Sequence, residues 1–337
     1  MHGNNIRIQK VNKMISEIAL EITQQCLNNC IYCSSCSSWE TDSQLNINVV
    51  KSVINDMEEL GINKICISGG EPFLHPDILG IIEYATQKKI NVVVYSSGII
   101  GTKEKTSSLD FHFLQKCKDK GLSRIIFNME ANDEVVYDKI MNTVGNFSKL
   151  IESMKNAKKA GIKTEIHFVP MKINLNQVNS VINLAEKLGI DTVSFLRLVT
   201  QGRAFSNKQL LELNLEEYKK LNRILQSRRN ESKINLRLGI PLSESSSLIK
   251  CHAVTGKLAI RYDGAVLGCE AFKGLPMRNS NNVIIEPDNI KTKRLKEIVK
   301  SSTYLQTCCD FINNNSDKRV ACENCPVQEY MKEQKNG

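Results

Sequence analysis

Short apolar segments alternate with amphipathic helical stretches along most of this chain, and this alternation restricts its fold more than any other feature. Six strands are expected, at residues 18–22, 64–68, 91–96, 124–129, 163–169 and 192–198. Helices with a regular apolar period are expected at residues 48–60, 147–160, 175–188 and 215–228. The last of these begins at Asn214 and Glu217, which have the spacing of a capping box. Strands that alternate with helices form βαβ units, so the pattern predicts an α/β fold with a partial (β/α)6 TIM-like barrel.

Three cysteines, Cys26, Cys30 and Cys33, follow the first expected strand in the spacing C-x3-C-x2-C. Three thiolates on one short loop can bind three irons of a [4Fe-4S] cluster and leave the fourth iron open to a small molecule. Cys36 adds one more C-x2-C step, so four thiolates could instead form a closed tetrahedral zinc site. The position of the loop at the end of a strand favours the cluster and makes Cys36 a spare thiol.

The second expected strand ends in the segment Gly69-Gly70-Glu71-Pro72. Glycines allow close backbone approach, and carbonyls and a carboxylate can accept hydrogen bonds from an ammonium group. Active sites of such barrels lie at the carboxyl ends of the strands, where both motifs fall. With the aromatic Tyr32 before the third cysteine, the two motifs resemble those of the radical S-adenosylmethionine (SAM) enzymes. The resemblance implies that the open iron binds SAM and that an electron from the cluster cleaves SAM to a 5′-deoxyadenosyl radical.

The resemblance also implies a set of SAM contacts at the strand ends. They are Tyr32, Gly69, Gly70, Glu71, Pro72, Ser96, Asn128, Glu130 and Arg197. Asn128 and Glu130 end the fourth strand, where a solvent-facing strand end is the alternative. Arg197 begins the segment R-L-V-T-Q-G-R and could pair with the SAM carboxylate, with an acidic substrate group, or in a barrel salt bridge. His167, on the fifth strand, is expected in the core, with a position in the barrel lumen as the alternative.

The polar segment 241–247 divides the chain, which is expected to comprise an N-terminal arm (1–15), the barrel (16–240) and a small α+β domain (241–337). Beyond the break, Cys251 and Cys269 flank a hairpin, and Cys322 and Cys325 form a C-x2-C pair. This arrangement resembles the twitch domain, a shortened SPASM domain, which implies one auxiliary [4Fe-4S] cluster and two clusters in all. A zinc knuckle is the alternative, because thiolate spacing alone does not distinguish the metals.

Composition places the chain in a reducing compartment. The twelve cysteines fall mostly in clustered spacings typical of metal ligation, and no apolar run is long enough to span a membrane. The N-terminal residues 1–13 are polar and basic, without the apolar region of a secretory signal. A cytoplasmic protein without a membrane partner is therefore expected. The formal charge of +9 suits a solvated surface or an acidic substrate, and nucleic acid is not an expected partner.

The function expected from the resemblance is hydrogen abstraction from a ribosomally synthesised peptide, leading to crosslinking or epimerisation, with the auxiliary cluster assisting electron transfer. A reductant such as a flavodoxin or ferredoxin would be a partner. The barrel begins close to the N-terminus without room for a peptide-recognition domain, which weakens the peptide hypothesis slightly. Two alternatives are dehydrogenation of a small aminocyclitol-like alcohol and a non-catalytic iron–sulfur electron carrier. The intact Gly69–Pro72 segment argues against the carrier.

Epimerisation would require a hydrogen donor, and a thiol is a suitable one. Three cysteines without another expected role are the candidate catalytic donors, namely Cys308, Cys309 and Cys36. Cys66 and Cys117, within an expected strand and an expected helix, are predicted to be small buried residues.

Overall fold

The computed structural model describes residues 15–239, 242, 251–279, 281–315 and 325–327, and a nine-stranded sheet forms its centre. The sheet has the order β11-β10-β1-β2-β3-β6-β7-β8-β9. Its parallel barrel strands are β1 (Glu17–Thr23), β2 (Lys64–Gly69), β3 (Asn91–Ser96), β6 (Leu122–Asn128), β7 (Lys163–Phe168), β8 (Thr192–Phe195) and β9 (Asn235–Leu238). All six expected strands are therefore confirmed, and β9 is an additional one. The strand order is linear, so the barrel is partial, as predicted.

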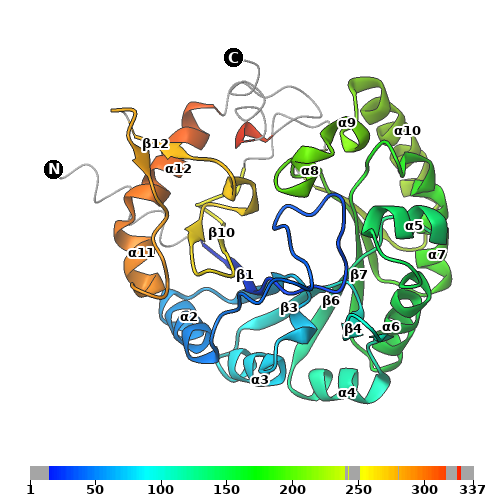
Figure 1. Cartoon of the computed structure of the whole chain (residues 1–337), viewed down its shortest axis with the longest axis horizontal. Helices are drawn as coiled ribbons and strands as arrows, with labels where there is room; N and C mark the ends of the chain where they lie inside the picture. The colour runs from blue at the N-terminus through cyan, green and yellow to red at the C-terminus, as the bar shows by residue number, and fades with distance from the viewer. Residues whose placement is uncertain (1–14, 240–241, 243–250, 280, 316–324, 328–337) are drawn as a thin grey trace.

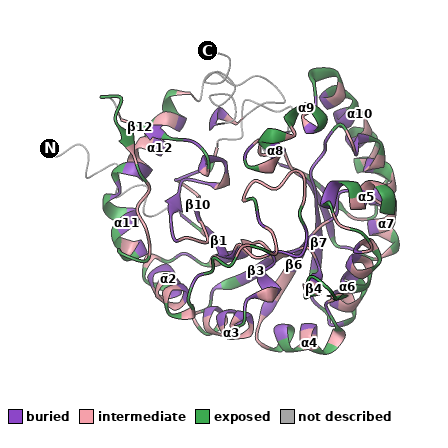
Figure 2. Cartoon of the chain, viewed as in Figure 1, coloured by how far each residue is buried: buried purple, intermediate pink, exposed green. Residues whose placement is uncertain are grey.

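Helices cover the outer face of the curved sheet (Figure 1). They are α2 (Ile47–Leu60), α3 (Ile78–Gln87), α4 (Phe111–Asp119), α5 (Glu134–Met141), α6 (Phe147–Lys159), α7 (Val178–Lys187) and α10 (Leu215–Glu231). Local sequence sets their ends. Helix α2 ends at Gly61, which has φ of 72°, and Asn214 and Glu217 form the predicted capping box of α10. Figure 2 shows the consequence: the strands are largely buried, and the exposed residues lie on the outer sides of the helices.

Alternating side chains of β7 point to opposite faces of the sheet. Phe168 packs against Phe195 of β8, with 5.6 Å between the ring centroids. His167, one residue earlier, lies instead 5.2 Å from the ring of Tyr95, and its Nε2 is 3.3 Å from Oε1 of Glu165. Glu165 also accepts hydrogen bonds from Ser194 and Arg124. His167 is buried, and it belongs to a polar network with Glu165.

The C-terminal part shares the sheet with the barrel. Strand β10 (Lys257–Ile260) pairs in parallel with β1, and β11 (Val266–Leu267) pairs antiparallel with β10. The expected hairpin therefore extends the barrel sheet at its edge. The remaining elements of this part are η4 (Glu270–Phe272), β12 (Met277–Arg278), β13 (Ile284–Ile285), α11 (Leu295–Ser301) and α12 (Thr303–Asn314). The proposed boundary at residue 240 lies outside the described residues, so that division of the chain stays a prediction.

Smaller elements shape the loops at the strand ends. They are η1 (Pro72–Leu74), the hairpin of β4 (Ile99–Gly101) and β5 (Thr106–Ser108), η2 (Leu175–Gln177), α8 (Arg203–Ser206) and α9 (Lys208–Leu211). Among the described helices, none combines the length and the apolar character that a membrane span requires.

Candidate active site

The three cysteines of the first motif lie on the loop that follows β1, which we call the cysteine loop (residues 24–38). Cys26 is buried, and Cys30 and Cys33 are half-buried. A turn joins the last two, because the Cys33 N–H donates to the Cys30 carbonyl at 3.2 Å. Burial, with the nearby Glu71 and Cys33, raises the pKa of Cys26 to about 12. Burial and the two neighbouring thiols likewise raise the pKa of Cys30.

The raised pKa values make Cys26 and Cys30 poor thiolates in the absence of a metal, whereas a bound metal deprotonates coordinating thiols. The soft donor set and its burial therefore fit an iron–sulfur cluster on this loop. The assignment of Cys26, Cys30 and Cys33 as its ligands stays a prediction.

The Gly69–Glu71 segment packs directly against the cysteine loop. The Gly70 N–H donates to the Thr23 carbonyl at 2.7 Å, and the Glu71 N–H donates to the Gln25 carbonyl at 2.8 Å. A Cβ on Gly69 would lie 2.1 Å from the Thr23 oxygen, and one on Gly70 would lie 2.1 Å from the Gln25 oxygen. Both glycines are thus required by the contact between the two motifs, which form one unit.

The Glu71 carboxylate joins the ends of β2 and β3. It is fully buried and accepts hydrogen bonds from Ser96 Oγ (2.8 Å), Ser97 N (2.7 Å), Ser97 Oγ (2.6 Å) and Phe73 N (3.2 Å). Burial raises the pKa of Glu71, although the four donors oppose this effect. Glu71 and Ser96, both expected to contact SAM, therefore also build the frame of the site. An ammonium group here would meet a carboxylate that already accepts four hydrogen bonds.

Tyr32 and Glu130, two further expected SAM contacts, bind each other. The Tyr32 hydroxyl donates to Glu130 Oε1 at 2.7 Å, and the Val169 N–H donates to Glu130 Oε2 at 2.7 Å. Burial raises the pKa of Glu130 to about 8, with the two donors acting against it. The pair links the cysteine loop to the ends of β6 and β7. Asn128 lies beside His167 in the strand register, and Arg197 follows β8 and is half-buried.

Arg203 fixes the middle of the cysteine loop, a role that the sequence analysis missed. Its Nε donates to the Cys30 carbonyl at 2.7 Å, and its Nη2 donates to the Ser37 carbonyl at 2.8 Å. Its backbone N–H donates to the Cys33 carbonyl at 3.0 Å. The positive charge of Arg203 also acts to lower the pKa values of Cys26 and Cys30, against the effect of burial.

Residues around Arg203 bring it close to the loop. A Cβ on Gly202 would lie 2.7 Å from the Cys33 oxygen, and the Asn207 side chain donates to the Ile31 carbonyl at 2.9 Å. One feature of the sequence could have indicated this contact, namely the Gly202-Arg203 dipeptide that ends the segment R-L-V-T-Q-G-R. In that segment, a role was predicted for Arg197 alone.

A groove of about 650 Å³ runs beside the first cysteine. Its walls include Cys26, Trp39, Lys103, Thr143 and Asn146. Asn146 donates to Asn28 Oδ1 at 3.1 Å, which holds this wall against the cysteine loop. The groove thus reaches a predicted cluster ligand from outside.

The auxiliary cysteines are described in part. Cys269 is buried, Cys251 and Cys325 are half-buried, and Cys322 lies outside the described residues. Burial raises the pKa of Cys269, and the negative charges of Glu270 and Cys325 raise it further, whereas Lys257 acts to lower it. These residues fit a second thiolate site, whose complete ligand set stays a prediction.

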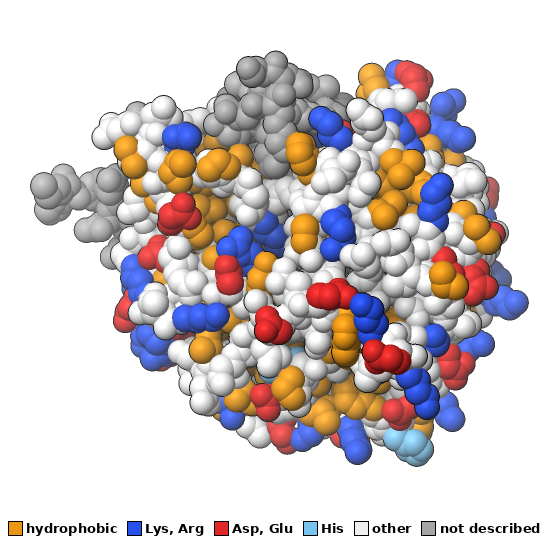
Figure 3. Space-filling model, in the orientation of Figure 1, with side chains coloured by type: hydrophobic (Ala, Val, Ile, Leu, Met, Phe, Trp, Pro, Cys, Tyr) orange, Lys and Arg blue, Asp and Glu red, His pale blue; other side chains and the backbone are white. Residues whose placement is uncertain are grey.

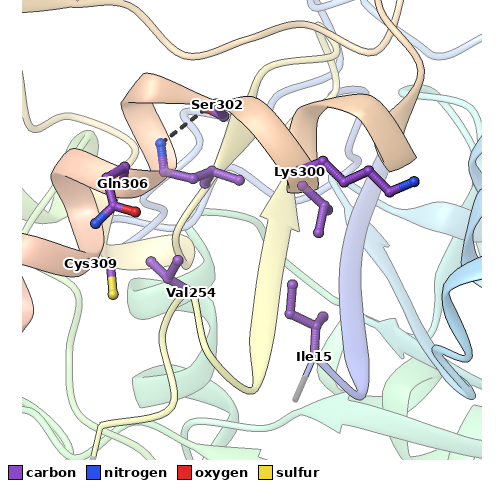
Figure 4. Close-up of a pocket in the computed structure, with 8 residues that line it drawn as sticks. Ile15, Val254, Lys300, Ser302, Gln306 and Cys309 are labelled. Carbon is purple, nitrogen blue, oxygen red and sulfur yellow. Dashed lines mark hydrogen bonds between the residues drawn. The ribbon is translucent and has the colours of Figure 1, made fainter. Parts of the chain in front are cut away.

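The three candidate hydrogen donors are widely distributed. Cys36 is exposed on the cysteine loop, and Cys308 is buried on α12. Cys309 lines a cavity of about 20 Å³, large enough for about one water molecule, together with Ile15 and Val254 (Figure 4). Ile15 precedes β1, whereas the cysteine loop follows it, so the length of that strand separates Cys309 from the loop. Of the three candidate donors, Cys36 is the one that lies on the cysteine loop, three residues after the predicted cluster ligand Cys33. Cys66 and Cys117 are buried, as expected.

Comparison with known proteins identifies the class. The profile of the radical SAM superfamily matches residues 20–193, and that of the SPASM iron–sulfur cluster-binding domain matches residues 251–326. The chain belongs to the radical SAM superfamily and carries a C-terminal SPASM domain. It is a radical SAM enzyme whose cofactors are [4Fe-4S] clusters and SAM.

Curated relatives are distant. An AdoMet-dependent heme synthase of Methanosarcina barkeri is 25% identical over 221 residues, 65% of this chain and 60% of the relative. The PqqA peptide cyclase of Bradyrhizobium diazoefficiens is 22% identical over 263 residues, 77% of this chain and 67% of the relative. The chain therefore matches less than two thirds of the length of the heme synthase.

Solved structures show the shared fold. Streptococcus suis SuiB, bound to precursor peptide SuiA, superposes with a TM-score of 0.72 at 16% identity, covering 96% of this chain and 78% of SuiB. The enzyme anSMEcpe with bound AdoMet superposes with a TM-score of 0.64 at 14% identity, covering 94% of this chain and 95% of that one.

Proposed function

We propose that this radical SAM enzyme abstracts a hydrogen atom from a ribosomally synthesised peptide and thereby crosslinks or epimerises it. The main support is the similarity to a PqqA peptide cyclase, which extends over 77% of this chain. Strand β10 of the SPASM part (residues 251–326) pairs with β1, the strand that precedes the cysteine loop. The cysteine loop and Cys269, a predicted auxiliary ligand, therefore follow strands of the same sheet.

Each part of the site has a defined task in this proposal. When bound, the first cluster and SAM supply the radical that takes the hydrogen atom. Cys26, Cys30 and Cys33 hold that cluster, and the Gly69–Glu71 segment orients the amino end of SAM. Arg203 keeps the cysteine loop in shape through its three hydrogen bonds. The Tyr32–Glu130 bond closes the site between the loop and the strand ends.

The groove beside Cys26 suits access by a one-electron donor such as a flavodoxin or ferredoxin. It approaches the predicted cluster from outside, and its rim carries Lys103, Lys105 and Lys149 together with Glu40 and Glu104. Figure 3 shows Lys, Arg, Asp and Glu side chains interspersed over the visible face of the molecule.

Mass spectrometry of peptide products tests the proposal. The reconstituted enzyme would be incubated with SAM, dithionite and short peptides encoded beside its gene. A crosslinked peptide two mass units lighter, or an epimer carrying one deuterium from deuterated water, supports it. Formation of 5′-deoxyadenosine without change in any peptide, together with turnover of a small alcohol or a tetrapyrrole, would contradict it.

Small-molecule chemistry is the second candidate. The specific observation in its favour is the heme synthase relative, whose identity of 25% exceeds that of the peptide cyclase. That match covers 65% of this chain, compared with 77% for the cyclase, so the peptide hypothesis is preferred.

A further inference from the structure

Lys273 of the SPASM part makes a buried contact with the cysteine loop. Its Nζ bonds to the Glu21 carboxylate at the end of β1, and it donates to Ser35 Oγ at 2.8 Å. Ser35 Oγ in turn donates to Glu21 Oε1 at 2.8 Å. The Lys273 and Glu21 side chains are only 9% and 8% exposed. The end of β1 and the cysteine loop therefore meet, at one charged group, a residue more than 200 positions later in the chain.

This cation remains charged although it is enclosed. Burial alone would lower the pKa of Lys273, but the Glu21 carboxylate, together with Glu270 and Cys33, leaves the pKa raised. Glu21 Oε2 is buried and has no hydrogen-bond partner among the described residues. A buried ion pair with an unsatisfied oxygen is a poor device for stability, since removing charges from water costs more than such a pair returns. A role for the charge itself is the better explanation.

The position of Lys273 is fixed from a second side. Gln201 binds the backbone next to it, because its side chain donates to the Ala271 carbonyl and accepts from the Gly274 N–H at 3.0 Å. Gln201 also directly precedes the Gly202-Arg203 pair that contacts the cysteine loop. The turn after Cys269 is thereby held against the segment that shapes the first cluster site.

The charge lies close to a predicted cluster ligand, because Lys273 Nζ binds Ser35 Oγ, two residues after Cys33 on the cysteine loop. A cation in a dry environment stabilises an added electron nearby, and cluster potentials depend on local charge and hydrogen bonding. A neutral residue at this position would make the same cluster harder to reduce.

We infer that Lys273 is a positioning residue for the first cluster, which it serves by holding the cysteine loop through Glu21 and Ser35 and by raising the reduction potential of that cluster. The SPASM part thus supports the cysteine loop of the first cluster site. The inference rests on membership of the radical SAM superfamily and is independent of whether the substrate is a peptide.

Redox titration of the full-length reconstituted enzyme, followed by electron paramagnetic resonance, tests this inference. The first cluster is recognised by the change in its signal when SAM is added. Lys273→Met should shift its midpoint potential downwards, and Glu21→Gln should shift it upwards because the cation is no longer neutralised. Lys273→Arg keeps the positive charge, so the midpoint potential of the first cluster should remain at the wild-type value.

An unchanged midpoint potential and an unchanged SAM-dependent signal in Lys273→Met would overturn the inference, even if thermal stability fell. If that variant does not fold, Glu21→Gln decides: an upward shift supports the inference, and no shift overturns it. None of these readouts uses a substrate, so failure here is distinguishable from failure of the proposed peptide reaction.

Discussion

The Tyr32 hydroxyl donates a hydrogen bond of 2.7 Å to Glu130, a carboxyl group that is completely buried. The bond connects the residue before Cys33 with the end of β6. It also gives the site a group that titrates near neutrality, because burial raises the pKa of Glu130 to about 8. Loop geometry and protonation are therefore coupled at this point.

Glu130 should make the folded protein less stable as pH rises. The pKa of Glu130 increases from 4.5 to about 8 on folding. Its contribution to the free energy of unfolding is therefore fully present below pH 4.5 and is lost as pH rises through 8. One such group changes the free energy of unfolding by at most about 1.4 kcal/mol for each pH unit. Denaturant unfolding between pH 5 and 9 should show a shallower decline for Glu130→Gln than for wild type. Parallel curves for the two proteins would contradict the assignment.

Replacing Cys26, Cys30 and Cys33 together by Ala should remove about half of the iron and all SAM cleavage, because one of two [4Fe-4S] clusters would be lost. Iron analysis and chromatography of 5′-deoxyadenosine provide the measurements. A wild-type content near four irons per chain would refute the two-cluster prediction. Cys117→Ala, which alters a buried thiol on α4, is the matched control and should retain the iron.

Arg203→Lys should loosen the cysteine loop although the charge is kept. Lysine has no planar fork and cannot reproduce the bonds to both the Cys30 and Ser37 carbonyls. Loss of one charge-assisted hydrogen bond corresponds to roughly 1.5–3 kcal/mol. We expect lower iron occupancy after reconstitution and weaker SAM binding by calorimetry. Arg223→Lys, on the exposed face of α10, should have neither effect.

Gly70→Ala should disrupt the contact between the two motifs, since its Cβ would lie 2.1 Å from the Gln25 oxygen. The variant should unfold at a lower temperature and retain little iron. Gly80→Ala, within helix α3, is the control, because the added Cβ would lie 3.6 Å from Ile47 Cδ1 of α2, an ordinary contact distance. That change should stabilise the protein by about 0.5–1 kcal/mol. Equal melting temperatures for the two variants would show that the close contact is absent in solution.

Glu71→Ala should weaken SAM binding by roughly 1.5–3 kcal/mol without loss of iron. The structure adds a second expectation, a lower unfolding temperature, because Ser96, Ser97 and Phe73 would lose their acceptor. Ser97→Ala removes one of these donors and separates the two effects. SAM affinity equal to that of wild type in Glu71→Ala would refute its role as a ligand.

The sequence allowed correct prediction of features that depend on local pattern. The six expected strands, the α10 capping box and the position of the cysteine loop all follow from residue periodicity and spacing. Contacts between residues far apart in the sequence leave no comparable pattern of periodicity or spacing. Arg203 binds backbone carbonyls, which every residue possesses, and Lys273 meets Glu21 only because β10 aligns with β1. The polar network of His167 was missed because alternation along a strand does not show which face is apolar.

The pairing of β10 with β1 has a consequence for biosynthesis. The first barrel strand leaves the ribosome early, but its outer neighbour is synthesised only after all other barrel strands. Until then the edge of β1 is an unpaired template on which other chains could assemble. Such a distant partner also slows folding, because the intervening chain must be ordered first. We therefore expect expression of residues 1–240 alone to yield aggregates, and co-expression of residues 251–337 to rescue solubility.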